Sequence, residues 1–215
     1  MISNVPAFIR ANTRISSPPH VPEVKLYLAD DAVTLWQMTE DELEQIGLPP
    51  PLWAFAWAGG QALARHVLDH PAIVAGKTVL DVASGSGLVG IAAMRAGAAE
   101  ATCADIDGFA AYAAILNAGL NGVDLTASDS DPLNHDPDAE VILVGDLFYD
   151  RDIAVRLLAW LRAQSARGCD ILVGDPGRSY LPKDALEQVA EYIVPTTKML
   201  EDAEVKRTGV WRLRA

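Results

Sequence analysis

The chain has 215 residues, of which 50% are hydrophobic and 21% are charged, the composition of an ordinary globular protein. Its 29 acidic residues outnumber 17 lysines and arginines, and the resulting net charge of -12 repels nucleic acid backbones and anionic membrane surfaces. No apolar run approaches the roughly 18 residues of a membrane-spanning helix, and the first residues lack the apolar core of a secretion signal. We therefore expect one domain with a short appendage, no nucleic acid or membrane partner, and a cytoplasmic location.

The appendage is expected to contain a helix, a β-hairpin and a second short helix. Two strand-like runs over 24–36 predict the hairpin. A capping box at Thr39 begins the short helix, and Gly47 ends it. Three consecutive prolines then disfavour both helix and central strand. They separate an appendage of residues 1–50 from a main domain over residues 51–215.

Beyond the prolines, short runs rich in valine, isoleucine and leucine alternate with helical stretches. This alternation is typical of βαβ units, in which helices cover both faces of a parallel sheet. The last two strand-like runs are separated by Glu201 and Asp202, a connection so short that it can join only antiparallel neighbours. The sequence therefore predicts a doubly wound α/β domain whose mostly parallel sheet is closed by an antiparallel C-terminal hairpin.

A glycine-rich loop between a strand and a helix points to a bound ligand. Gly85, Gly87 and Gly90 have the spacing G-x-G-x-x-G, in which the first glycine permits a tight turn and the second lets a ligand approach the backbone. Ser86 lies between the first two and is expected at the ligand with them. Asp105 ends the next strand-like run, 18 residues after Gly87, where a carboxylate can accept both hydroxyls of a ribose. We expect a nucleoside-containing ligand.

Asp81, at the end of the strand before this loop, distinguishes two such ligands. NAD would bring an anionic pyrophosphate against the carboxylate, whereas S-adenosylmethionine presents a cationic sulfonium and an ammonium group. The charges favour S-adenosylmethionine as the cofactor. The alternatives are structural: Asp81 can cap the turn, and the glycines can serve close packing of strand and helix.

Several segments together resemble the class I S-adenosylmethionine-dependent methyltransferases, which implies their seven-stranded Rossmann-like sheet. The ribosomal protein L11 methyltransferases are similar from Val79 to Gly122, but their N-P-P-Y type motif is missing after the fourth strand. The residues that carry the class I likeness are D-x-A-S-G-S-G from Asp81 to Gly87, Asp105-Ile106-Asp107, Asn117 and Asn121-Gly122.

A second set of segments resembles the electron transfer flavoprotein β-subunit lysine methyltransferases from about Val21 to Leu213. The segments are residues 49–60, 145–150 and 174–182 and the final V-W-R-L. This resemblance implies a protein substrate with a lysine in a basic segment, and the electron transfer flavoprotein β subunit is the first candidate. Composition and spacing do not identify the acceptor.

The carboxyl ends of the later strands are expected to face the acceptor, because ligands of open parallel sheets bind there. Asp146 and Asp175 each follow a Val-Gly pair at such an end, and two carboxylates suit a cationic acceptor. The resemblance marks Asp146 and Tyr149 as a D-x-x-Y motif that faces the target lysine, so these two are the catalytic candidates. The same resemblance implies that Trp57 lies where the chain crosses the methyl donor. Alternatively, Asp146 caps the segment that follows it, and Trp57 is a core or interface residue. For Asp175 an ordinary turn is favoured over a catalytic role.

Three further residues complete the expected cofactor side. Ile106 follows Asp105 in the motif, and Ser128 and Asp129 follow the third strand-like run, where adenine contacts usually lie. The four histidines show no metal spacing, so no metal site is expected.

Other functions remain open beside lysine methylation. An L11-like methyltransferase shares the glycine loop. A non-catalytic nucleoside-binding protein would use the same loop without needing Asp146 and Tyr149. An NAD-dependent reductase is disfavoured by the charge of Asp81 and by the closing hairpin.

Overall fold

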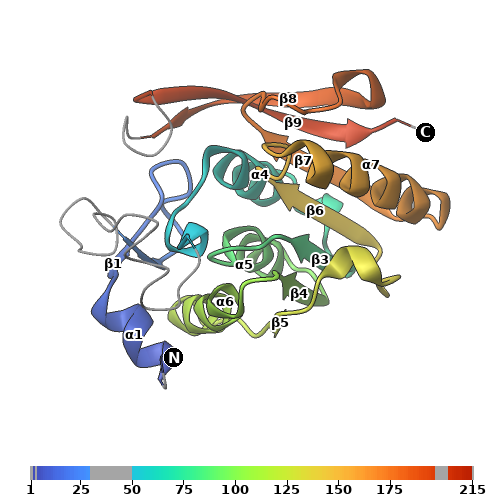
Figure 1. Cartoon of the computed structure of the whole chain (residues 1–215). Helices are drawn as coiled ribbons and strands as arrows, with labels where there is room; N and C mark the ends of the chain where they lie inside the picture. The colour runs from blue at the N-terminus through green and yellow to red at the C-terminus, as the bar shows by residue number, and fades with distance from the viewer. Residues whose placement is uncertain (1, 3, 30–49, 197–202, 215) are drawn as a thin grey trace.

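The computed structural model describes residues 2, 4–29, 50–196 and 203–214, and a seven-stranded sheet forms its centre (Figure 1). The strands are β3 (Thr78–Val82), β4 (Glu100–Ala104), β5 (Thr126–Ser128), β6 (Val141–Gly145), β7 (Asp170–Asp175), β8 (Leu186–Pro195) and β9 (Val205–Leu213). Their order is β5-β4-β3-β6-β7-β9-β8. The chain moves outward from β3 through β4 and β5, then continues on the other side of β3 with β6, so the sheet is doubly wound as predicted.

Strand direction also follows the prediction. The pairs β3–β4, β3–β6, β4–β5 and β6–β7 are parallel, whereas β9 runs antiparallel to both β7 and β8. The hairpin of β8 and β9 therefore closes the sheet, with a register shift between Gln188 and Ala190. The predicted turn residues Glu201 and Asp202 lie outside the described residues.

Helices cover both faces of the sheet (Figure 1). One face packs against α4 (Ala58–Asp69), α5 (Leu88–Arg95) and α6 (Gly108–Asn121), and the other against α7 (Arg151–Ala166). Successive strand residues point to opposite faces, so in β6 Leu143 joins the core under α4 and α5, whereas Ile142 and Val144 join the core under α7. Burial on both faces explains why the parallel strands are almost continuously apolar. Among the described helices, none combines the length and apolarity that crossing a bilayer requires.

The N-terminal segment contains α1 (Val5–Ala11), β1 (Arg14–Ser16) and β2 (Leu26–Leu28). The predicted helix is present, but β2 pairs with β1 rather than with a described strand after it. The second strand expected within 24–36 and the helix expected from Thr39 lie outside the described residues.

This segment packs onto the main sheet domain. Ile9 of α1 is fully buried in a cluster with Trp53 and with Ala110 of α6. Asn121, at the end of α6, bonds the backbone N–H and carbonyl of Lys25 at 3.0 and 2.7 Å. The described appendage therefore shares buried surface with α6, and a domain boundary at residue 50 stays a prediction.

Candidate functional site

A cavity of about 710 Å³ lies beyond the carboxyl ends of the parallel strands. Small-molecule sites typically enclose roughly 300–1,000 Å³. We call one part of its wall the glycine-loop side (Gly85, Asp105 and Ile106) and another the Asp146 side (Asp146, Tyr149 and Arg178). The strand order reverses at this point, which is where open α/β sheets bind ligands.

A second pocket of about 50 Å³ adjoins this cavity. Trp57, Gly85 and Asp146 line both spaces, and the smaller pocket also reaches Asp81 and Ser86. The structure thus brings eight of the eleven predicted site residues, all but Gly87, Ser128 and Asp129, to two adjoining spaces.

The glycine loop needs its glycines for backbone geometry and for packing. Gly85 and Gly87 have φ values of +51° and +77°, in the left-handed region that favours glycine. A Cβ on Gly87 would lie 2.8 Å from the Cβ of Ala114, and one on Gly90 would overlap the Sγ of Cys103. Close packing of strand and helix, the alternative role of these glycines, therefore applies to Gly87 and Gly90, whereas Gly85 also lines the cavity.

Asp105 is anchored by the loop that it faces. Its carboxylate accepts hydrogen bonds from the backbone N–H of Gly85 at 2.9 Å and of Asp107 at 3.0 Å. Burial raises the pKa of Asp105 above its ordinary value. The residue therefore holds the turn while it presents a carboxylate to the cavity, next to the 72% exposed Ile106.

Asp81 is a buried helix cap that also reaches the small pocket. It accepts a hydrogen bond from the N–H of Gly90 in the first turn of α5 at 2.9 Å, which fits the alternative interpretation of Asp81 as a capping residue. Burial, with a smaller contribution from the nearby Asp105 carboxylate, raises the pKa of Asp81 to about 7. A cation in the adjoining pocket would favour the ionised carboxylate.

Asn117 of α6 forms hydrogen bonds to both the glycine loop and the N-terminal segment. It is fully buried, donates to the carbonyl of Ser86 at 2.8 Å, and accepts from the N–H of Tyr27 at 2.7 Å. One amide therefore joins the loop to β2, and the position of Ser86 depends on the N-terminal segment.

On the opposite side, Asp146 adopts a left-handed conformation with φ of +57°, which is uncommon for a residue other than glycine. Its N–H donates to the carbonyl of Gly174 at 2.9 Å, and its Oδ2 accepts from the N–H of Gly60 in the first turn of α4 at 2.8 Å. The alternative interpretation placed a cap on the segment that follows Asp146, but that cap is Asp150 at the start of α7, and the Asp146 carboxylate instead bonds the first turn of α4.

Glycines permit this close approach of α4 to the strand ends. A Cβ on Gly174 would overlap the carbonyl oxygen of Gly59, and a Cβ on Gly59 would lie 2.5 Å from Oδ2 of Asp146. A Cβ on Gly145 would lie 3.2 Å from the Cα of Gly60. The Ala-Gly-Gly start of α4 and the Val-Gly ends of β6 and β7 therefore fit together.

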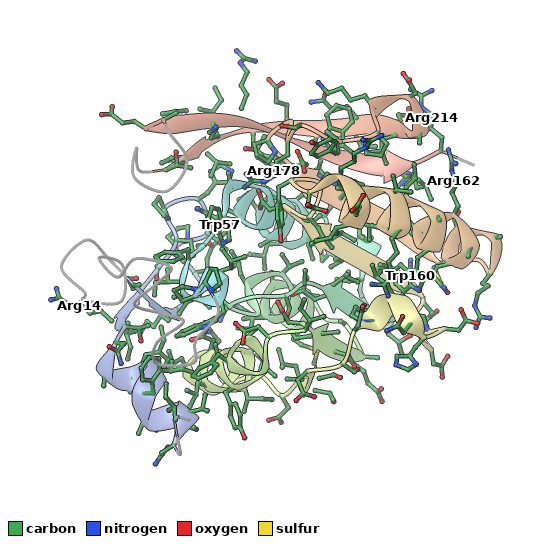
Figure 2. All side chains as sticks on the ribbon, in the orientation of Figure 1. Arg14, Trp57, Trp160, Arg162, Arg178 and Arg214 are labelled. Carbon is green, nitrogen blue, oxygen red and sulfur yellow. The ribbon has the colours of Figure 1, made fainter. Side chains whose placement is uncertain are left out.

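Arg178 is a site residue that the sequence analysis missed. Its Nη2 and Nε donate to Oδ1 of Asp146 at 2.6 and 3.1 Å, and its guanidinium lies 5.6 Å from the ring centroid of Trp57 (Figure 2). The Oδ1 of Asp175 accepts from the N–H groups of Gly177 and Arg178, both at 2.7 Å, which confirms the turn interpretation of Asp175. The turn sequence could have located Arg178, but its partner lies 32 residues away.

The aromatic residues divide between core and cavity. Tyr149 is 48% exposed on the cavity wall, and burial raises its pKa. Trp57 donates from Nε1 to the carbonyl of Leu52 at 2.9 Å, lines both pockets, and is therefore more than a core residue. Phe148, between the two motif positions, is fully buried under α7.

Ser128 and Asp129 do not line the cavity. The chain passes them at the end of β5 and reaches the wall three residues later, at Asp131, Pro132 and Leu133. The sequence analysis placed Ser128 just after the strand, whereas Ser128 is the last residue of β5. Among the described residues, no group of three His, Cys, Asp or Glu is arranged to hold a metal ion.

Comparison with known proteins identifies the family. A family model described as "Ribosomal protein L11 methyltransferase (PrmA)" matches residues 62–145. The electron transfer flavoprotein β-subunit lysine methyltransferase of Mus musculus is 36% identical over 95% of this chain and 82% of its own length. The human protein of that name is 34% identical over 96% and 81%, and the Caenorhabditis elegans homolog 33% over 94% and 93%. The chain belongs to the electron transfer flavoprotein β-subunit lysine methyltransferase family. This family is a branch of the methyltransferases, as the resemblance implied.

Solved structures agree on the fold. A ribosomal protein L11 methylase from Lactobacillus delbrueckii is 22% identical with a TM-score of 0.51, and covers 74% of this chain and 81% of that one. The magnesium protoporphyrin IX methyltransferase of Synechocystis, solved with bound SAH, is 12% identical with a TM-score of 0.53 over 72% and 81%. The family member described here thus has the methyltransferase fold.

Proposed function

We propose that this chain transfers methyl groups from S-adenosylmethionine to lysine side chains of a protein, with the electron transfer flavoprotein β subunit as the first candidate. One observation carries the proposal: a single cavity joins the loop carboxylate Asp105 to the D-x-x-Y pair Asp146 and Tyr149, in a chain whose relatives bear that name. A cytoplasmic location is part of the same proposal.

The residues of the glycine-loop side fit the methyl donor. Asp105 offers carboxylate oxygens for ribose hydroxyls, and Ile106 and Leu133 offer apolar surface for adenine. Asp81 lies at the small pocket, where an ammonium group would neutralise it. The donor supplies an electrophilic methyl group on a sulfonium. The backbone of Gly85 and Ser86 is available at the small pocket to contact the donor.

The residues of the Asp146 side receive the acceptor. Asp146 orients the incoming nitrogen, and Tyr149 and Trp57 form aromatic walls that exclude water from it. Methyl transfer is an in-line displacement, so positioning of nitrogen, methyl and sulfur is the main catalytic contribution. The amine must also lose a proton, which for a lysine of pKa roughly 10.4 costs about 4 to 5 kcal/mol at neutral pH.

Labelled transfer tests the proposal. Wild-type enzyme is incubated with methyl-labelled donor and either purified electron transfer flavoprotein β subunit or ribosomal protein L11, and the sites are located by mass spectrometry. Methyl groups on lysines of the flavoprotein subunit are expected. The L11 arm is included because the family model favours that substrate as the second candidate. Label on arginine or on the α-amino terminus, or no label on lysine, would contradict the lysine assignment.

Salt is a second variable in this assay. A chain of net charge -12 should attract a lysine in a basic segment, and that attraction is screened as the Debye length falls. The apparent KM for the protein substrate should rise with salt while the affinity for the methyl donor changes less. A KM that is independent of salt would remove the basic segment from the proposal.

A further inference from the structure

The carboxylate of Asp146, which the proposed function places beside the acceptor amine, poses an electrostatic problem that this function alone does not solve. A negative charge beside an amine favours the ammonium form and raises its pKa, but methyl transfer requires the neutral amine. Asp146 lies at the cavity wall, so an ionised and unbalanced carboxylate there would oppose the deprotonation that the reaction needs.

Arg178 is placed to balance that charge. Two of its N–H groups bond Oδ1 of Asp146, and the side chains are only 19% and 9% exposed, so the pair is largely shielded from solvent. Hydrogen bonds between a guanidinium and a carboxylate, both charged, are among the stronger ones.

Contacts with three of the described residues help to fix Arg178 in this place. Asp175 holds its backbone N–H, Asp146 holds the guanidinium edge, and Trp57 lies against the guanidinium face. A lysine that displaced Arg178 would leave a buried guanidinium without this partner, which is costly. An arginine held on its backbone, its edge and its face therefore stays in place while an acceptor enters.

We propose that Arg178 is a positioning residue that stays paired with Asp146 when the acceptor binds, and so keeps that carboxylate from holding the acceptor as an ammonium ion. The inference deepens the proposed function and rests on it. Asp146 then orients the nitrogen as a hydrogen-bonding group whose charge is already balanced.

Other charges around the cavity do not replace this pair. Arg156 of α7 is bonded to Asp131 at 2.7 Å, so those two charges already balance each other. Among the residues that the structure describes, the other titratable groups facing the two pockets are Asp81, Asp105, Asp107 and Tyr149, from the ends of β3 and β4, the start of α6 and the loop after β6.

The test measures kcat against pH from 6.5 to 9.5 with saturating donor and protein substrate. The pH dependence of kcat reports ionisations of the enzyme–substrate complex. The decline of kcat toward low pH, which we call the acid limb, therefore reflects the pKa of the bound acceptor amine. For Arg178→Gln this limb should move to higher pH by about one unit, so that kcat at neutral pH falls about tenfold and recovers in alkali. Arg178→Lys, which keeps the charge, should stay near the wild-type limb.

Two further variants separate charge balance from general damage. Arg156→Gln is the matched control, because it removes an arginine paired with an aspartate on the same cavity, and its acid limb should stay at the wild-type pH whatever its rate. Asp146→Asn combined with Arg178→Gln removes both charges, and its limb should return toward the wild-type position. The double variant keeps the test valid if the unpaired carboxylate of Arg178→Gln impairs folding.

The outcomes are distinct. An active Arg178→Gln variant whose limb does not move, or a limb that moves equally in Arg156→Gln, would overturn the inference and leave the proposed function intact. A wild-type enzyme that methylates no lysine would overturn the proposed function and this inference with it.

Discussion

Asp81 and Asp146 occupy equivalent places in the fold but balance their charges differently. Each lies at the carboxyl end of a parallel strand, is buried, and accepts a hydrogen bond from the N–H of a glycine in the first turn of a helix. Burial and Asp105 raise the pKa of Asp81 to about 7. Asp146 instead has the guanidinium of Arg178 at 2.6 Å.

Under the proposed function, the two adjoining pockets would treat two cations in opposite ways. A carboxylate with a raised pKa gains most from a ligand's positive charge, which suits a permanently cationic methyl donor beside Asp81. A carboxylate already paired within the protein attracts a second cation less, which suits an acceptor that must become neutral beside Asp146. Four changes test this contrast.

The largest effect should come from the packing that places Asp146. Gly174→Val would force side-chain atoms into the carbonyl of Gly59, so we expect destabilisation above about 3 kcal/mol or failure to fold. Gly60→Ala is the control, because a Cβ there meets nothing within 4 Å. Urea unfolding measures both. Equal stability of Gly174→Val and wild type would show that the close approach is not required.

Asp146→Asn should lower methyl transfer about 100-fold while changing donor affinity little, because orientation is lost and the donor contacts remain. Asparagine tolerates the left-handed backbone, so φ of +57° should be kept. Single-turnover rates and calorimetry with S-adenosylhomocysteine measure the two effects separately. Loss of donor affinity in step with activity would move Asp146 to the donor site.

Asp105→Ala should act in the opposite way, weakening donor binding by about 1.5 to 3 kcal/mol. The variant loses the carboxylate toward the ribose and also the bond to the N–H of Gly85. Asp129→Asn, at a residue that does not line the cavity, is the control and should bind normally. Unchanged calorimetric affinity of Asp105→Ala would assign that residue to the turn alone.

The smallest effect concerns the pH dependence of donor binding. Because Asp81 has a pKa of about 7, a cationic donor should bind several-fold more tightly at pH 8 than at pH 6, and Asp81→Asn should remove this dependence.

The raised pKa of Asp81 also predicts how the stability of the ligand-free protein changes with pH. The folded state keeps a proton that the unfolded carboxylate loses near pH 4, so this contribution to stability should decline as pH rises from about 4 to 7. Melting temperatures of wild type and Asp81→Asn over that range measure the difference. A difference that does not change with pH would contradict the raised pKa.

The glycine-loop side was predictable because its contacts are local. Gly90 lies nine residues after Asp81, and Gly85 lies 20 residues before Asp105, so one strand-turn-helix motif and the next strand end contain the whole arrangement. Ser128 and Asp129, the predicted adenine contacts, do not line the cavity, because strand length alone does not show where the following loop reaches the cavity wall.

The sequence by itself determined the strand and helix alternation, the glycine loop, and the strand ends where Asp81, Asp105 and Asp146 stand, because apolar periodicity and turn chemistry act over a few residues. Only the tertiary structure brought Gly60 and Arg178 to the carboxylate of Asp146, from positions 86 and 32 residues away. The physical reason is that these contacts depend on the side-by-side packing of β6 and β7 and on glycines that let α4 approach them. Local patterns of residues in the sequence do not predict which distant segments pack together in this way.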